Sequence, residues 1–275
     1  MKYLRVKING EEIEYFVNGK GKNIIFIHGL GSSAKVWKKV INRLSNKFRC
    51  WTISLPKYKD FEIRIYSELI KGFIEKLKIE NPYVVGSSLG GLISIDFANR
   101  NEIEKMVLVS TPLTRITPKG LKILIESLDK KINEDEFFKR LSEWFLSIIP
   151  ATKKIMKKNS LKFFTKYIKG IANLDFPFDC SKLKLDEEFI LVYGKDDLFL
   201  KILHGLEIYE EIGAKKIIVL DSGHSIPTKN PKKLSEIIEN FFSDKPKDII
   251  EVIVEFISES LEKLFDFIAN FLNYK

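Results

Sequence analysis

The sequence predicts an α/β fold in which a mostly parallel central sheet is flanked by helices. One observation is a set of four short apolar runs, each followed by glycine and polar residues, at 24–27, 83–85, 190–193 and 217–220. Such runs are typical of parallel strands buried on both faces. A second observation is helical spacing of apolar residues between the runs, as at 63–77. Because open α/β sheets place their sites at the carboxyl ends of strands, we expect the functional residues there.

The composition is typical of a globular protein. The chain has 275 residues, of which 45% are hydrophobic and 30% are charged, so it can bury a large core. No apolar run is long enough to cross a bilayer and no signal peptide begins the chain, so we expect a cytoplasmic protein without a membrane span. Cys50 and Cys180 are expected to be reduced thiols. Neither has metal-ligand spacing, so we expect no metal and no cofactor.

The net charge of +9 is concentrated in one segment of the chain. Residues 113–178 contain 14 Lys or Arg and 7 Asp or Glu. A lysine-rich solvated surface on amphipathic helices explains this surplus, and attraction of anionic substrates or an acidic surface is the alternative. Because no nucleic-acid-binding motif accompanies the charge, nucleic acid is not an expected partner.

The order of the remaining elements follows from turn signals and periodicity. Asn9-Gly10 separates two short strands, at 3–8 and 13–17, and is a strong hairpin signal. The other predicted strands lie at 48–54, 105–110, 189–193 and 215–220. The predicted helices lie at 36–44, 63–77, about 89–99, 200–212 and 231–242.

The motif Gly-x-Ser-x-Gly stands between an apolar run and a helical pattern, within Tyr-Val-Val-Gly-Ser-Ser-Leu-Gly-Gly at 83–91. Only Ser88 fits the serine position of the motif. Side chains at Gly86 and Gly90 would collide with the incoming strand and the outgoing helix. The sharp turn would lift the Ser88 hydroxyl above the sheet edge, close to the positive end of the helix.

Three other polar clusters follow the remaining apolar runs. They are His-Gly-Leu-Gly at 28–31, Gly-Lys-Asp-Asp at 194–197 and Asp-Ser-Gly-His at 221–224. With these four motifs in this order, the chain resembles the α/β-hydrolase superfamily over about residues 3–243, in particular its serine-nucleophile, esterase- and lipase-like branch with a helical cap. The resemblance implies the α/β-hydrolase fold.

The resemblance divides the chain into three parts. The hydrolase core is expected at 1–112 and 179–247, with a helical cap at 113–178. Aromatic residues at helical spacing in the cap would fill its own core or roof the active site. Residues 248–275 have apolar positions in a heptad rhythm and predict an extra amphipathic helix. This helix would pack on the body, form a homodimer contact or, least readily, bind a membrane surface.

The same motifs suggest a catalytic triad. Ser88 would be the nucleophile, and His224 would take its proton and later pass it to the leaving group. The carboxylate that orients the imidazole is Asp196 or Asp197. In similar proteins the acid lies three residues after the glycine that ends the strand, here Gly194, which favours Asp197.

The resemblance also suggests an oxyanion hole. The backbone N–H groups of Leu30 and Leu89 would donate to the oxyanion, while His28 and Gly29 would support the turn. The sequence departs from many relatives at 54–60, where glycines usual in this loop are missing. The serine at position 88 argues against the dehalogenase and epoxide-hydrolase branches, which need a carboxylate nucleophile.

These observations predict a serine hydrolase. The simplest activity is hydrolysis of small-molecule carboxylic esters with apolar acyl groups through an acyl-serine intermediate. A lactonase, thioesterase, C–C hydrolase or aminopeptidase would use the same triad. A ligand-binding or receptor-like protein with little turnover is the alternative from a different class.

Overall fold

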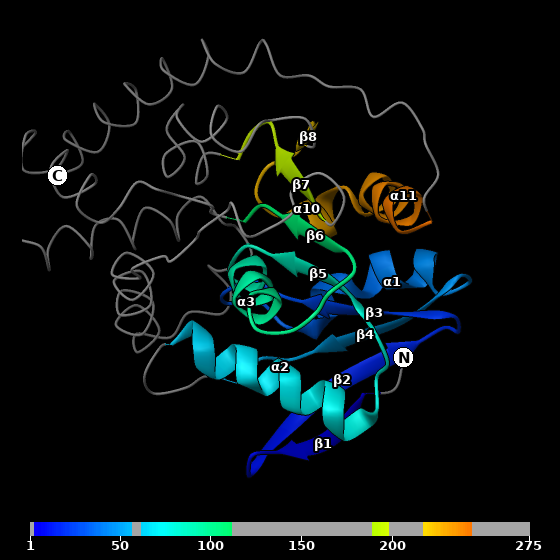
Figure 1. Ribbon diagram of the computed structural model, residues 1–275. Coiled ribbons are helices and arrows are strands. Elements are labelled where there is room, and N and C mark those ends of the chain that lie inside the picture. The colour runs from blue at the N-terminus through cyan, green and yellow to red at the C-terminus, as the bar shows by residue number, and fades with distance from the viewer. Residues whose placement is uncertain (1–2, 57–61, 112–188, 198–216, 244–275) are drawn as a thin grey trace, which may run out of the picture. The chain divides into compact units, whose positions relative to one another are not determined.

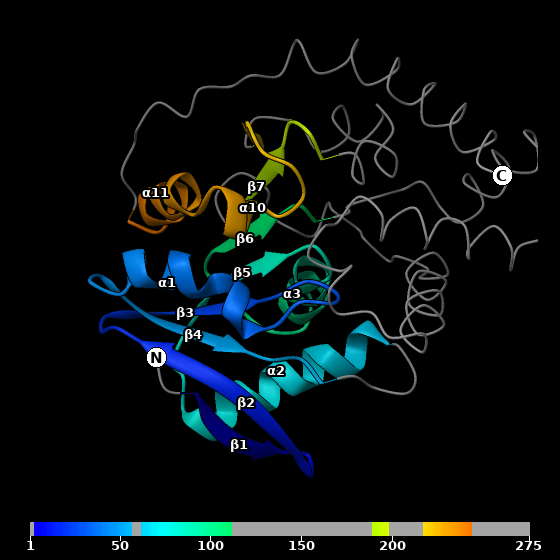
Figure 2. The same cartoon turned by 180° about the vertical axis from the view of Figure 1, so that it is seen from behind.

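The computed structural model describes residues 3–56, 62–111, 189–197 and 217–243 (Figures 1 and 2). All of these residues except Glu62 belong to one compact unit. The predicted cap at 113–178, the predicted helix at 200–212 and the predicted C-terminal helix at 248–275 lie outside the described residues. The domain boundaries proposed from the sequence therefore stay predictions.

A mostly parallel sheet forms the centre of the described part of the chain. Its strands are β1 (Leu4–Ile8), β2 (Glu11–Asn18), β3 (Lys22–Ile27), β4 (Phe48–Ile53), β5 (Tyr83–Ser87), β6 (Met106–Val109), β7 (Phe189–Gly194) and β8 (Ile217–Leu220). Their order across the sheet is β1-β2-β4-β3-β5-β6-β7-β8. The hairpin strands β1 and β2 pair antiparallel, as does β2 with β4, and the other neighbours are parallel. This arrangement confirms the α/β fold class predicted from the sequence.

Helices cover both faces of this sheet (Figures 1 and 2). The elements are the 3-10 helix η1 (Ala34–Trp37) and the helices α1 (Lys38–Leu44), α2 (Ile63–Leu77), α3 (Leu89–Ala98), α10 (Ile226–Lys229) and α11 (Pro231–Phe242). Helices α2 and α3 lie together on one face, and α1 and α11 pack against each other on the opposite face. The two faces of the parallel strands are therefore both buried, which explains their continuous apolar runs.

Alternate residues of the strands supply the core beneath α1 and α11. Ile24 and Phe26 of β3 belong to this cluster, as do Val85 of β5 and Val192 of β7. The residues between them face the other side, as expected for a side-chain period of two. Burial of this many apolar side chains stabilises the sheet, which in turn holds the ends of its strands in fixed positions.

Two helical elements differ from those predicted. The helix predicted at 36–44 begins earlier, as the 3-10 turn η1, and becomes α-helical only at Lys38. The short helix α10 was not predicted, because four residues are too few for a helical period to be visible. The hairpin prediction is confirmed, since Asn9 and Gly10 both have positive φ, at 48° and 87°, as a type I′ turn requires.

Two expectations drawn from composition can be compared with the described residues. Cys50 is a buried free thiol, and burial raises its pKa to about 12, so it stays protonated and unreactive near neutral pH. Cys180 lies outside the described residues. Within the ranges given above, no helix is both long enough and apolar enough to cross a membrane.

Candidate active site

Ser88 occupies a sharp turn between β5 and α3. Its backbone has φ 54° and ψ −119°, a region that residues with side chains rarely adopt. A side chain at Gly86 would overlap the Gly90 carbonyl, and one at Gly90 would overlap the backbone of Ile27 at the end of β3. The two glycines are therefore needed for the turn, as the sequence predicts. The turn places Ser88 directly before the first residue of α3, at the positive end of the helix dipole.

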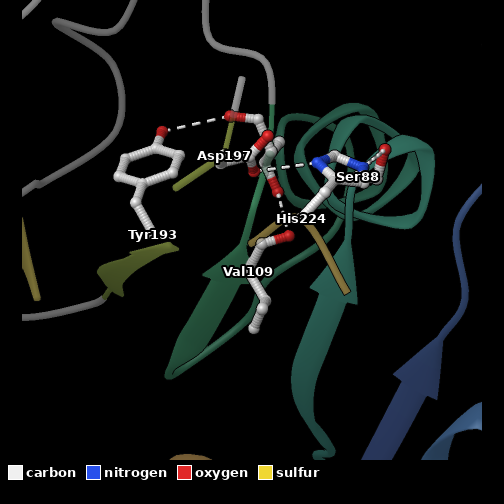
Figure 3. A network of polar contacts seen from close by, with 6 residues as sticks. Ser88, Val109, Tyr193, Asp197 and His224 are labelled. Atoms are coloured by element: carbon white, nitrogen blue, oxygen red, sulfur yellow. Dashed lines mark hydrogen bonds and ion pairs between the residues drawn. The ribbon is translucent and has the colours of Figure 1, made fainter. Parts of the chain in front are cut away.

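The structure brings Ser88, His224 and Asp197 into one hydrogen-bonded line (Figure 3). Nε2 of His224 lies 3.1 Å from Oγ of Ser88, and Nδ1 of the same ring lies 2.8 Å from Oδ2 of Asp197. An ionised carboxylate can only accept, so Nδ1 must carry the proton of the neutral ring. The lone pair on Nε2 is then available to accept the Ser88 hydroxyl proton. This tautomer is the one that a general base beside a serine requires.

Asp197 and the adjacent Asp196 differ in burial. Asp197 is 1% exposed and bonded to His224, whereas the side chain of Asp196 is exposed. The backbone of the acid loop is tied to the histidine loop, because Lys195 N–H donates to Leu220 O at 2.7 Å and Asp196 N–H donates to Ser222 O at 3.0 Å. These two backbone bonds hold the loop that carries Asp197 beside the loop that carries His224. Of the two aspartates left open by the sequence, the geometry therefore favours Asp197.

The loop after β3 lies beside the Ser88 side chain. A Cβ added to Gly29 would lie 3.0 Å from the Ser88 Cβ and 3.1 Å from the Ser87 carbonyl, so a larger residue here would crowd the serine turn. Leu89 is the first residue of α3, and the first N–H groups of a helix have no partner within it. Leu30 follows Gly29 in the adjacent loop. The two backbone donors predicted for the oxyanion hole thus come from segments that flank Ser88, and that role stays a prediction.

His28 connects the Gly29 loop to the segment after β4. Leu55 N–H donates to Nε2 of His28 at 3.0 Å, so Nδ1 carries the ring proton and donates to Gly29 O at 2.8 Å. Burial lowers the pKa of His28 to about 4, although the bond to the Gly29 carbonyl opposes this shift. A neutral ring with both nitrogens engaged braces the loop and has no free site for proton transfer.

This lowered pKa predicts a pH-dependent stability. Between about pH 6.5 and about pH 4 the unfolded chain binds a proton at His28 that the folded protein excludes, so stability falls as the pH falls through this window. From about pH 7 to about pH 5 the expected loss is about 2 kcal/mol. The check is urea unfolding at both pH values for the parent and for His28→Gln, which cannot titrate there. The variant should show a smaller loss by about this amount, and equal losses in both proteins would contradict the assignment.

Comparisons with known proteins agree with this architecture. A model of the α/β-hydrolase fold matches residues 22–144. An enol-lactonase structure from Burkholderia xenovorans has a TM-score of 0.64 at 16% identity, and the match covers 87% of this chain and 100% of that one. The chain is an α/β-hydrolase-fold protein.

Two sequence relatives of this α/β-hydrolase-fold protein are named hydrolases. YugF of Bacillus subtilis, named an uncharacterized hydrolase, is 22% identical over 86% of this chain and 96% of its own. A 2-hydroxy-6-oxononadienedioate/2-hydroxy-6-oxononatrienedioate hydrolase of Paraburkholderia xenovorans is 20% identical over 88% of this chain and 95% of its own. The first name states no substrate and the second states one, so together they support hydrolase chemistry in general.

Two contacts of this α/β-hydrolase site were not visible in the sequence. One is the bond from Leu55 N–H to His28, which depends on a loop whose family glycines are missing here. The other joins Tyr193 of β7 to Thr111, which follows β6. The two residues of each pair are far apart in the chain, and no single motif contains both of them. Only the adjacency of β3 with β4, and of β6 with β7, could have suggested them.

Proposed function

We propose that this protein is a serine hydrolase that cleaves carboxylic esters through an acyl-Ser88 intermediate. The observation that carries the proposal is the line from Ser88 Oγ through His224 to the buried carboxylate of Asp197. A serine hydroxyl is a weak nucleophile by itself and needs an adjacent base that is oriented by a third group. The three residues supply this arrangement in the neutral tautomer that it requires.

In the proposed reaction, Ser88 Oγ attacks the ester carbonyl carbon while its proton passes to Nε2 of His224. The negative charge on the carbonyl oxygen would be stabilised by the Leu30 and Leu89 N–H groups and by the positive end of α3. Asp197 would stabilise the imidazolium that forms. The imidazolium then protonates the departing alkoxide, and His224 activates water to release the acid from the acyl-enzyme.

An apolar acyl group is the proposed preference. It rests on the aromatic residues of the segment 113–178, which lies outside the described residues, and so it depends on the sequence alone. A second candidate is cleavage of a C–C bond next to a ketone, favoured by the similarity to the Paraburkholderia xenovorans hydrolase. The same serine and histidine would serve both reactions.

The test is steady-state hydrolysis of p-nitrophenyl esters from acetate to laurate by the full chain. We expect many turnovers per protein and a maximum of kcat/KM at butyrate or longer, because a longer apolar chain buries more surface. Short charged esters are assayed beside this series, and much faster hydrolysis of them than of butyrate or hexanoate esters would contradict the apolar preference. The absence of turnover with all esters, together with cleavage of a vinylogous 1,5-diketone, would replace the ester proposal by the C–C one.

A further inference from the structure

The segment after β6 lies between the nucleophile and the acid strand. Val109 O, at the end of β6, accepts Ser88 N–H at 2.8 Å, and it also accepts the Thr111 hydroxyl at 3.4 Å. On the other side, Ser110 N–H donates to Val192 O of β7 at 2.8 Å. Residues 109–111, here named the β6-end segment, therefore contact the serine turn and the strand that leads to Asp197 (Figure 3).

The β6-end segment has an unfavourable local conformation. Ser110 has φ 46°, although it is not glycine, and it is fully buried. Within the described part of the chain its hydroxyl has no hydrogen-bond partner. A left-handed backbone at a non-glycine residue and an unpaired buried hydroxyl are each destabilising. Such a conformation persists only where the surrounding contacts hold it in place.

The hydroxyl of Tyr193 is one of the contacts that hold the segment. It donates to Thr111 O at 3.0 Å, from a ring that is 5% exposed in β7, four residues before Asp197. The Thr111 side chain in turn lies against Gly91, where any added Cβ would overlap the Thr111 hydroxyl. Gly91 N–H donates to Ser88 O at 2.9 Å. A chain of contacts thus runs from the acid strand to the serine turn without passing through His224.

We infer that Tyr193 is a positioning residue that fixes the distance between the Ser88 turn and the Asp197 loop. This inference rests on the proposed serine-hydrolase function. A phenylalanine at this position would keep the ring packing but leave the Thr111 carbonyl without its donor. The β6-end segment could then relax from its strained conformation, and Ser88 would shift relative to His224. Because catalytic rates depend steeply on such alignment, the loss should be in kcat and not in substrate binding.

The experiment compares Tyr193→Phe with Thr52→Val in the full chain. Thr52 is 1% exposed and donates to Phe26 O at 3.1 Å, so its replacement also removes one buried hydroxyl-to-carbonyl bond, but within β4 and β3. The readouts are melting temperature, kcat and KM for p-nitrophenyl butyrate, and the rate of labelling by a fluorophosphonate probe. Rates are divided by the concentration of sites that the probe titrates, so partial unfolding does not count as lost catalysis.

For Tyr193→Phe we expect a roughly tenfold lower kcat, a roughly tenfold lower labelling rate and an unchanged KM. For Thr52→Val we expect kcat and the labelling rate to change by about twofold or less, at a similar loss of melting temperature. Equal kcat values for the two variants, or a change confined to KM, would overturn the positioning role while the ester activity of the parent stands. A parent protein that neither hydrolyses esters nor reacts with the probe would overturn the proposed function, and the positioning role with it.

Discussion

Replacement of Ser88 by alanine is expected to lower kcat for ester hydrolysis by about three orders of magnitude or more. The variant cannot form the acyl-enzyme, so only binding and the oxyanion donors would act on an attacking water. The folded structure should persist, because alanine keeps the Cβ of Ser88 and removes only the hydroxyl, which is bonded to Nε2 of His224. The measurement is steady-state hydrolysis of p-nitrophenyl butyrate, with circular dichroism to confirm folding.

Ser87 provides the matched control for that experiment. It directly precedes Ser88 at the end of β5 and is buried, but His224 Nε2 is bonded to the hydroxyl of Ser88. Ser87→Ala should therefore keep kcat within about threefold of the parent. If Ser87→Ala and Ser88→Ala lose activity equally, or if Ser88→Ala keeps most of it, the assignment of the nucleophile is wrong.

Replacement of Asp197 by asparagine is expected to lower kcat by about three to four orders of magnitude. An amide in place of the carboxylate can donate to Nδ1 of His224, which would leave the ring proton on Nε2, facing Ser88. The ring could then not accept the serine proton. The amide would also fail to stabilise the imidazolium of the transition state. The measurement is kcat at neutral pH, with melting temperature as the check on folding.

Asp196→Asn is the neighbouring control, because its side chain is exposed while Asp197 is buried at 2.8 Å from the ring. This change should alter kcat by about twofold or less, as expected of a surface substitution. The contrary result, a large loss for Asp196→Asn with little effect of Asp197→Asn, would mean that the loop adopts another arrangement in solution.

Much of the fold could be predicted because its signals are local. The parallel strands are short apolar runs that end in glycine or polar residues, and α2 shows a clear helical period from Ile63 to Leu77. The Asn9-Gly10 turn specifies its hairpin by backbone geometry alone. The residues now found in line at Ser88, His224 and Asp197 could be proposed in advance, since each follows a strand within a motif of characteristic spacing.

The remaining contacts depend on tertiary structure and leave no local signal. Nothing in the residues around Ser110 indicates a positive φ, because the conformation results from bonds to Ser88 and to β7. The link from Tyr193 to Thr111 spans 82 positions of the chain, and that from Leu55 to His28 spans 27. The spacing from Gly194 favours Asp197 over Asp196, whereas the burial of Asp197 is a tertiary feature that two adjacent aspartates do not reveal.

The central claim, that Ser88 is the activated nucleophile, is tested most directly by mapping the site of covalent labelling. The full chain is treated with a fluorophosphonate, digested, and its peptides are analysed by mass spectrometry. The structure predicts one phosphonyl group per chain, on the hydroxyl of Ser88, and no labelling of the Ser88→Ala variant. Labelling of a different residue, or none under conditions that label a known serine esterase, would contradict the account.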